Sequence, residues 1–173
     1  MLKFKFILLL SILIIFNSCA KDKVKTSVIK EKSLELQVFE AYNEGMEAFE
    51  AGDVLYAAKK FNEAEVLFPQ SDWAPRYALM AAYSYYVQDY YPDSIAELER
   101  FIKVYPFYKD ISYVHYLLGI CYFEQIVDEK KDLRSIRQAK DKFEFVIKEY
   151  PTTKYAIDAD FKIDLINDIL ASK

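Results

Sequence analysis

The chain has 173 residues, 53% of them apolar and 17% aromatic, enough to bury the core of one domain or a short array of repeats. Three glycines and five prolines are too few for the many turns of a β-sandwich or barrel, and they favour long helices. The formal charge of −4, without a basic patch, argues against nucleic acid as a partner, and two cysteines cannot form a disulfide framework.

The N-terminus has the parts of an export signal. Lys3 and Lys5 precede the apolar run 6–16, whose 11 residues are too short to span a bilayer core of about 30 Å, and Ser18 and Cys19 follow. This order resembles the signal peptides of bacterial lipoproteins, which implies a signal peptide at 1–18 and acyl chains such as palmitate on Cys19. We expect a flexible, lysine-rich tether over 19–33. An ordinary secretory signal with an incidental cysteine is the alternative.

A repeated pattern organises the predicted domain, residues 34–173. A small residue, a large apolar residue and a proline recur, with a spacing of 37 residues and 8 additional residues inside the third unit. The three sets are Gly45, Phe61 and Pro69; Ala82, Leu98 and Pro106; and Gly119, Phe143 and Pro151. The small residues allow two helices to approach closely, and each proline ends the second helix of its unit.

The first unit also carries Gly52-Asp53, Ala57 and Ala64, and it resembles the tetratricopeptide repeat. Gly52 is suited to end one helix and Asp53 to cap the next. We therefore predict an all-α solenoid of antiparallel helix pairs, about three repeats plus one helix. The predicted helices are 36–51, 54–68, 73–88, 92–105, 111–127, 133–150 and 154–171.

The last predicted helix has an apolar stripe at helical spacing. Its members are Tyr155, Ala159, Ile163, Ile166 and Leu170. We interpret this helix as the first half of a fourth unit. Because a solenoid without a terminal cap exposes an apolar face, the stripe predicts self-association.

In a stack of helix pairs, the first helix of each pair lines the concave face. By register, the side chains on that face are aromatic or aliphatic: Phe39, Tyr42, Met46, Phe49, Leu79, Tyr83, Tyr86, Tyr116, Ile120 and Phe123. Such a groove suits an extended or helical apolar peptide. Alternatively, some of these rings belong to the core between paired helices.

The remaining reactive residues do not suggest catalysis. His115 is the single histidine and is interpreted as a packing or surface residue, and Cys121 lies in an apolar stretch and is interpreted as a buried free thiol. The segment 128–134 has mixed charge and is expected to be a solvated loop, with a partner contact as the alternative. The sequence contains no glycine-rich phosphate loop, metal-ligand spacing or Ser/His/Asp arrangement, so we predict neither an enzyme nor a cofactor or metal.

Two segments resemble a known family. They are RFIKVYPFYKDISYVHYLLGICYFEQIVD (100–128) and KYAIDADFKIDLINDILASK (154–173), and they resemble the BamD family, the lipoprotein component of the outer-membrane β-barrel assembly machinery. The FEQIVD and KIDL segments resemble its alphaproteobacterial branch. The family continues into further repeats, so we interpret the sequence as a C-terminally shortened form.

The resemblance implies a location and a set of partners. The protein would be lipid-anchored on the periplasmic face of the outer membrane and would bind the β-barrel subunit through its POTRA domains. Other assembly lipoproteins and unfolded outer-membrane proteins would be further partners. Phe68 matches the family's aromatic residue before the first closing proline, which places it in the peptide-binding groove. The alternative is a generic periplasmic repeat adaptor for cell-wall or pilus machinery.

Overall fold

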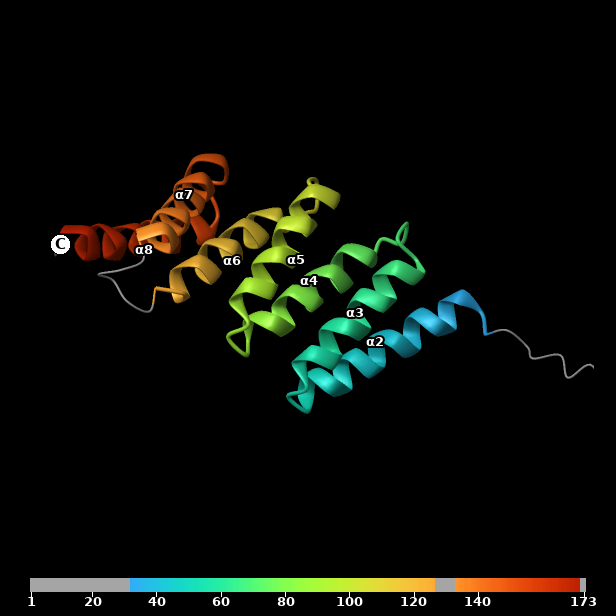
Figure 1. Cartoon of the computed structure of the whole chain (residues 1–173). Coiled ribbons are helices and arrows are strands. Elements are labelled where there is room, and N and C mark those ends of the chain that lie inside the picture. The colour runs from blue at the N-terminus through green and yellow to red at the C-terminus, as the bar shows by residue number, and fades with distance from the viewer. Residues whose placement is uncertain (1–31, 127–132, 172–173) are drawn as a thin grey trace, which may run out of the picture. The chain divides into compact units, whose positions relative to one another are not determined.

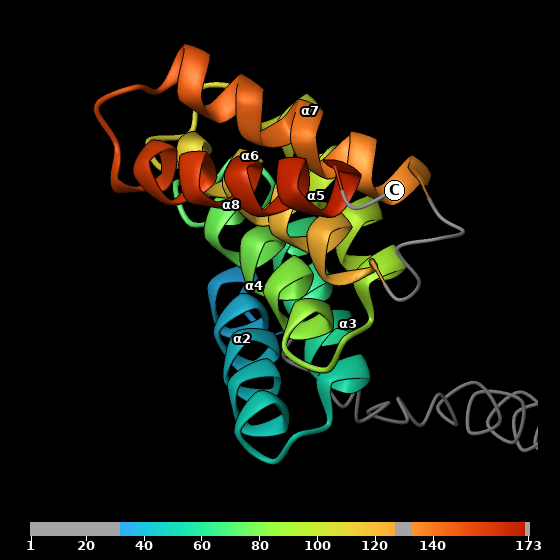
Figure 2. The ribbon, with the colours of Figure 1, turned by 90° about the vertical axis from the view of Figure 1, so that its left-hand side faces the viewer.

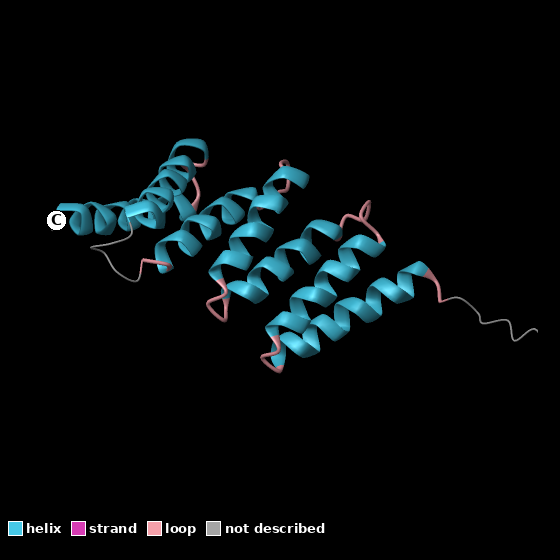
Figure 3. Cartoon of the chain, viewed as in Figure 1, coloured by secondary structure: helices cyan, strands magenta, loops and turns pink. Residues whose placement is uncertain are grey.

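The computed structural model describes residues 32–126 and 133–171, which belong to one compact unit. The predicted signal peptide, Cys19 and the tether up to residue 31 lie outside the described residues, as does most of the predicted loop 128–134. The described part is built of helices joined by short loops and contains no strand (Figures 1 and 3). No helix in it is both long and apolar enough to cross a membrane.

Every predicted helix is present, and its ends lie within three residues of the prediction. The helices are α2 (Leu34–Glu50), α3 (Val54–Leu67), α4 (Ala74–Tyr86), α5 (Tyr91–Val104), α6 (Ile111–Glu124), α7 (Leu133–Glu149) and α8 (Lys154–Ala171). Each helix packs mainly against its neighbours in sequence, and α6 also contacts α8. This pattern of neighbour contacts is that of a solenoid, and Figure 2 shows the stack from its end.

The small residues of the repeat do allow the close approach that the sequence predicts. A Cβ atom on Gly45 would lie 2.8 Å from Phe61, and one on Gly119 would lie 2.7 Å from Phe143. Both phenylalanines are fully buried. The paired helices therefore interlock at the same place in the first and third repeats.

The first turn between paired helices also follows the prediction. Gly52 has a φ of 81°, a left-handed conformation that glycine adopts without steric cost. The backbone N–H of Tyr56 donates to the Asp53 carboxylate at 3.2 Å, so Asp53 caps α3.

The apolar stripe of α8 is not exposed, contrary to the prediction. Ala159 and Ile166 are fully buried, and Ile163 packs against the core as α8 contacts α6 and α7. Tyr155 and Leu170 are likewise partly buried against it. Ala159 and Ile166 are therefore unavailable for self-association, and the other stripe residues expose only part of their surface. The exposed apolar residues of α8 lie on its other side: Ile157, Phe161 and Leu165.

Candidate functional site

The predicted groove residues of the first two repeats form a chain of ring contacts from α2 to α5. Phe49 lies 6.0 Å from Tyr83 between ring centroids, Tyr83 lies 5.8 Å from Tyr86, and Tyr86 lies 6.2 Å from Tyr91. At the other end of α2, Tyr42 contacts Phe61 and Tyr77. These spacings are those of favourable aromatic pairs, which make the surface rigid.

A second aromatic group joins α6 to α7 and α8. Tyr116 lies 5.4 Å from Tyr155 and 6.1 Å from Phe143, and its hydroxyl hydrogen-bonds to Asp158. Phe123 contacts Phe143, and the ammonium group of Lys162 lies 4.9 Å from the Phe123 ring centroid.

Tyr113 of α6 belongs to the second aromatic group. Its ring lies 5.4 Å from that of Tyr155. Burial raises the pKa of Tyr113, and the neighbouring Tyr83, Tyr155 and Tyr86 hydroxyls add to this effect. Tyr113 packs against the same core cluster as Tyr83 and Tyr86 of α4.

Most predicted groove residues have a mixed role. Tyr42, Met46, Phe49, Leu79, Tyr83, Tyr86, Tyr116 and Phe123 are partly buried and pack against the core. Ile120 is only 6% exposed and belongs to the core, because it adjoins Gly119 where α7 approaches α6. Phe68 is 37% exposed and ends α3 rather than lying on a first helix. Most predicted groove residues are therefore partly or wholly core residues, which agrees with the alternative that some of these rings belong to the core between paired helices.

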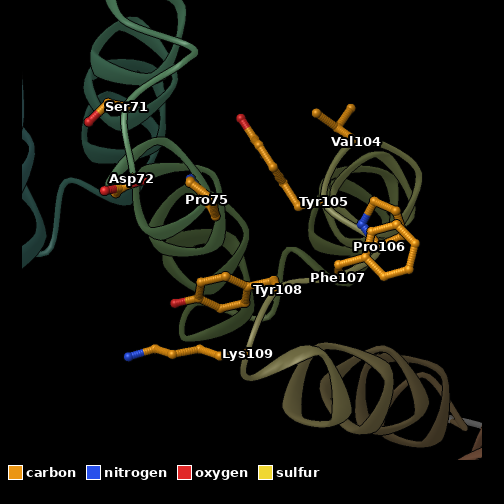
Figure 4. Close-up of a pocket in the computed structure, with 9 residues that line it drawn as sticks. All are labelled: Ser71, Asp72, Pro75, Val104, Tyr105, Pro106, Phe107, Tyr108 and Lys109. Carbon is orange, nitrogen blue, oxygen red and sulfur yellow. The ribbon is translucent and has the colours of Figure 1, made fainter.

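A hollow that the sequence analysis missed lies at the edge of the stack where repeats join. It has a volume of about 600 Å³ (Figure 4). Its lining comes from two loops and the helix ends beside them: Ser71, Asp72, Pro75, Val104, Tyr105, Pro106, Phe107, Tyr108 and Lys109. Phe107 is 97% exposed beside it. The two proline-aromatic segments SDWAP and YPFY were the available signal, but only the fold brings them together.

Polar side chains connect the first repeat to the second, an arrangement we call the first junction. Glu65 of α3 is 5% exposed and receives two hydrogen bonds from the Arg100 guanidinium of α5, at 2.6 and 2.9 Å. The Tyr105 hydroxyl donates to the same carboxylate at 2.7 Å. Arg100 also donates to Glu97, which accepts a hydrogen bond from Asn62. A guanidinium can form two parallel hydrogen bonds with one carboxylate. This cluster therefore constrains the orientation of the second repeat relative to the first.

Cys121 is buried, as predicted, and His115 is partly buried with its ring against two aromatic rings. The His115 ring lies 4.6 Å from that of Phe145 and 5.9 Å from that of Tyr150. Cys121 is a buried free thiol, and burial raises its pKa to about 11, although a hydrogen bond to Ser94 acts in the opposite direction. Such a thiol is a poor nucleophile. Among the described residues, no three His, Cys, Asp or Glu side chains are placed to hold a metal ion.

Antiparallel helix pairs stacked in sequence order are the architecture of tetratricopeptide-repeat domains. The first such domain of Spaghetti (RPAP3), solved with an HSP90 peptide, superimposes with a TM-score of 0.56 at 15% identity, covering 79% of this chain and 94% of that one. A family model described as outer membrane lipoprotein, YfiO, matches residues 35–173. The chain therefore belongs to the YfiO family of outer membrane lipoproteins.

Relatives from two alphaproteobacteria carry the name outer membrane protein assembly factor BamD. The one from Caulobacter vibrioides is 40% identical over 156 residues, which are 90% of this chain and 50% of the relative. The one from Rickettsia prowazekii is 33% identical over 165 residues, or 95% of this chain and 63% of the relative. These matches confirm the predicted resemblance. The chain thus spans about half to two thirds of the length of these relatives.

Proposed function

We propose that this protein is a non-catalytic scaffold in the assembly of outer-membrane proteins, anchored by lipid on Cys19 to the periplasmic face of the outer membrane. The observation that carries the proposal is the family match over residues 35–173, which covers the whole repeat array. The relatives named assembly factor BamD extend over most of this chain. A rigid stack of helix pairs offers a long surface on which several partners can be held at once.

The proposed partners are the β-barrel subunit, through its POTRA domains, other assembly lipoproteins, and unfolded outer-membrane proteins. For the unfolded proteins, the supporting feature is the run of partly buried rings from Phe49 through Tyr83 and Tyr86. Rigid aromatic side chains give a large contact area at low entropic cost, and tyrosine hydroxyls can bond to a peptide backbone.

A pull-down from detergent-solubilised envelope tests the scaffold role. With the full chain as bait, a β-barrel subunit that contains POTRA domains is expected to be recovered. Recovery of cell-wall or pilus components without that subunit would instead support a generic periplasmic adaptor.

Peptide binding tests the groove separately. The double substitution Tyr83→Ala and Tyr86→Ala is expected to weaken binding of C-terminal peptides from outer-membrane proteins at least about tenfold, since anchor residues contribute more than about 1 kcal/mol each. The matched control is Tyr56→Ala with Tyr90→Ala, two exposed tyrosines outside the predicted groove. Equal affinities of the two double variants would remove the main support for the groove.

A further inference from the structure

The spacing of the repeats defines the equivalent place between the second and third repeats, which we call the second junction and where residues of α5, α6 and α7 line one hollow. Ile102 lies 37 residues after Glu65, and Phe145 lies 45 residues after Arg100, the spacings that relate second helices of successive repeats. The ion pair of the first junction is thus replaced by two apolar residues. The Phe145 ring lies 4.6 Å from that of His115, and Phe145 is not among the residues that line the hollow beside it.

This difference leaves a hollow of about 290 Å³ at the second junction. Three helices contribute to its lining, which consists of Glu99, Ile102, Lys103, His115, Leu118 and Lys142. Ile102 and Leu118 are apolar, whereas the other four side chains are charged or can become so. A hollow with apolar walls and a few convergent polar groups is the usual form of a small-ligand site.

The hollow is positively charged although the chain as a whole is acidic. Lys142 stands where the first junction has Glu97, 45 residues earlier, so this position has changed from acid to base. In the described part of the chain, neither Lys103 nor Lys142 has a carboxylate within 4.0 Å. The lining acid, Glu99, accepts a hydrogen bond from the Tyr122 hydroxyl at 3.2 Å. The lining therefore contains two lysines and one glutamate.

The imidazole of His115 remains available for a ligand. None of the hydrogen bonds found among the described residues involves its ring, and no side-chain nitrogen or oxygen there is both fully buried and without a partner. Its ring nitrogens are therefore open to solvent. A neutral imidazole can donate one hydrogen bond, and a protonated imidazole can donate two.

We propose that the hollow between α5, α6 and α7 binds a phosphate group, held by Lys103, Lys142 and His115. At the first junction, the Glu65 carboxylate pairs with the Arg100 guanidinium. At the second junction, the bound oxyanion would supply the negative charge that pairs with the lysines. This site lies apart from the aromatic groove and does not depend on the assembly role proposed above. Its ligand is recognised by charge and by hydrogen bonds to oxygen.

The binding is expected to be coupled to a proton on His115. Burial lowers the pKa of His115, and the positive charge of Lys142 lowers it further. Lys142 from α7 is the charged group that acts on the His115 ring. Glu99 and Lys103 from α5 line the same hollow, and the Tyr150 ring lies 5.9 Å from the imidazole. A bound anion favours the imidazolium, so it must raise this pKa, and an anion of constant charge must bind more tightly as the pH falls.

The single histidine of the chain makes this coupling directly measurable. The imidazole signal of the full chain is followed by NMR from about pH 8 to about pH 5, the range in which histidine titrates, with and without inorganic phosphate. Sulfate serves as a second probe because it does not itself titrate in this range. The expected result is a saturable rise of the His115 pKa by about one unit, equal to tenfold tighter binding to the protonated form.

Substitution of Lys142 distinguishes phosphate binding from the direct effect of the lysine charge on the His115 pKa. Lys142→Gln is expected to raise the His115 pKa of the free protein, because a like charge is removed, and at the same time to reduce its response to phosphate. Lys103→Gln is expected to reduce the response as well. Lys59→Gln is the matched control: it removes the same charge from an exposed position on α3 and is expected to respond as the wild type does.

Two binding experiments distinguish a soluble phosphate ligand from a lipid headgroup. A response to inorganic phosphate without binding to phosphatidylglycerol vesicles indicates a soluble ligand. Vesicle binding that is lost in the double variant Lys103→Gln/Lys142→Gln indicates a lipid headgroup. The proposal is overturned if neither probe acts, if sodium chloride of equal ionic strength reproduces the shift, or if the double variant, shown to be folded by its NMR spectrum, responds fully.

Discussion

The two junctions between successive repeats occupy equivalent places but are built from different chemistry. At the first junction, Glu65 and Arg100 form an ion pair that is satisfied within the chain. At the second junction, the equivalent positions hold Ile102 and Phe145, and a cation-lined hollow remains. The repeat thus preserves the position of its helices while the contacts between second helices are free to diverge.

The difference shows that packing within a helix pair is more tightly constrained than packing between successive helix pairs. Within a pair, Gly45 against Phe61 and Gly119 against Phe143 leave no room for a Cβ atom, so the residue types cannot change independently. Between pairs, the contacts are made by long side chains that can be exchanged for others.

The largest expected effect comes from Arg100→Ala at the first junction. It leaves the Glu65 carboxylate buried without its guanidinium, which should cost about 3 kcal/mol of unfolding free energy, the low end for a broken buried pair because Arg100 is partly exposed. Urea unfolding measures the loss. The register-equivalent control, Phe145→Ala, should cost only about 1 kcal/mol, because that ring is already partly exposed. Equal losses would mean that the junctions do not differ energetically.

Gly45→Ala and Gly119→Ala should each cost about 1–2 kcal/mol, because overpacking against a buried ring outweighs the better helix propensity of alanine. Similar thermal or urea shifts in the two variants would show that intra-pair packing is the constant part of the repeat. A stabilised variant would instead show that the facing phenylalanine moves aside without cost.

Converting the first junction into the second sharpens the comparison further. The double variant Glu65→Ile with Arg100→Phe should remain within about 1 kcal/mol of the wild type, because apolar replacement of a buried ion pair is close to neutral. A double-mutant cycle against the single substitutions gives the coupling energy. If the double variant is no more stable than Arg100→Ala alone, the cluster contributes more than a replaceable contact.

The smallest effect is the pH dependence that His115 confers on the second junction. Since burial lowers its pKa in the folded state, the unfolded chain binds this proton first. The stabilising contribution is complete above the ordinary histidine pKa of about 6.5 and is lost as the pH falls through the lower folded-state value. Relative to His115→Phe, the wild type should therefore lose stability on acidification in phosphate-free buffer. A constant difference at all pH values would contradict this assignment.

The sequence predicted the helices well because their signals are local. Apolar spacing, Gly52-Asp53 and the recurring prolines each act within a few residues, and all seven described helices follow from them. The helix α8 itself was predicted correctly, but its apolar stripe was predicted to be exposed, and that part of the prediction was wrong. Ile166 lies on an apolar stripe that would be exposed in a bare helix, but α6 and α7 already cover it.

For the candidate sites too, features set by local register were predictable, whereas features set by the packing of helices were not. Register alone placed Phe49, Tyr83 and Tyr86 on one face, and the structure brings their rings into contact. Register could not reveal that Ile120 is buried beside Gly119, because that depends on how closely α7 approaches. Nor could it show that the proline-aromatic loops line one open hollow, since each loop alone is only a turn.

By itself, the sequence determined the repeat, the helix boundaries and the glycine positions at which paired helices touch, because backbone propensity and the space for a side chain are read residue by residue. The tertiary structure decided which polar side chains meet. Glu65 and Arg100 are 35 residues apart, and His115, Lys103 and Lys142 come from three helices. Whether such groups pair internally or face an open hollow depends on the distances between helices that are not adjacent in sequence, which no local pattern specifies.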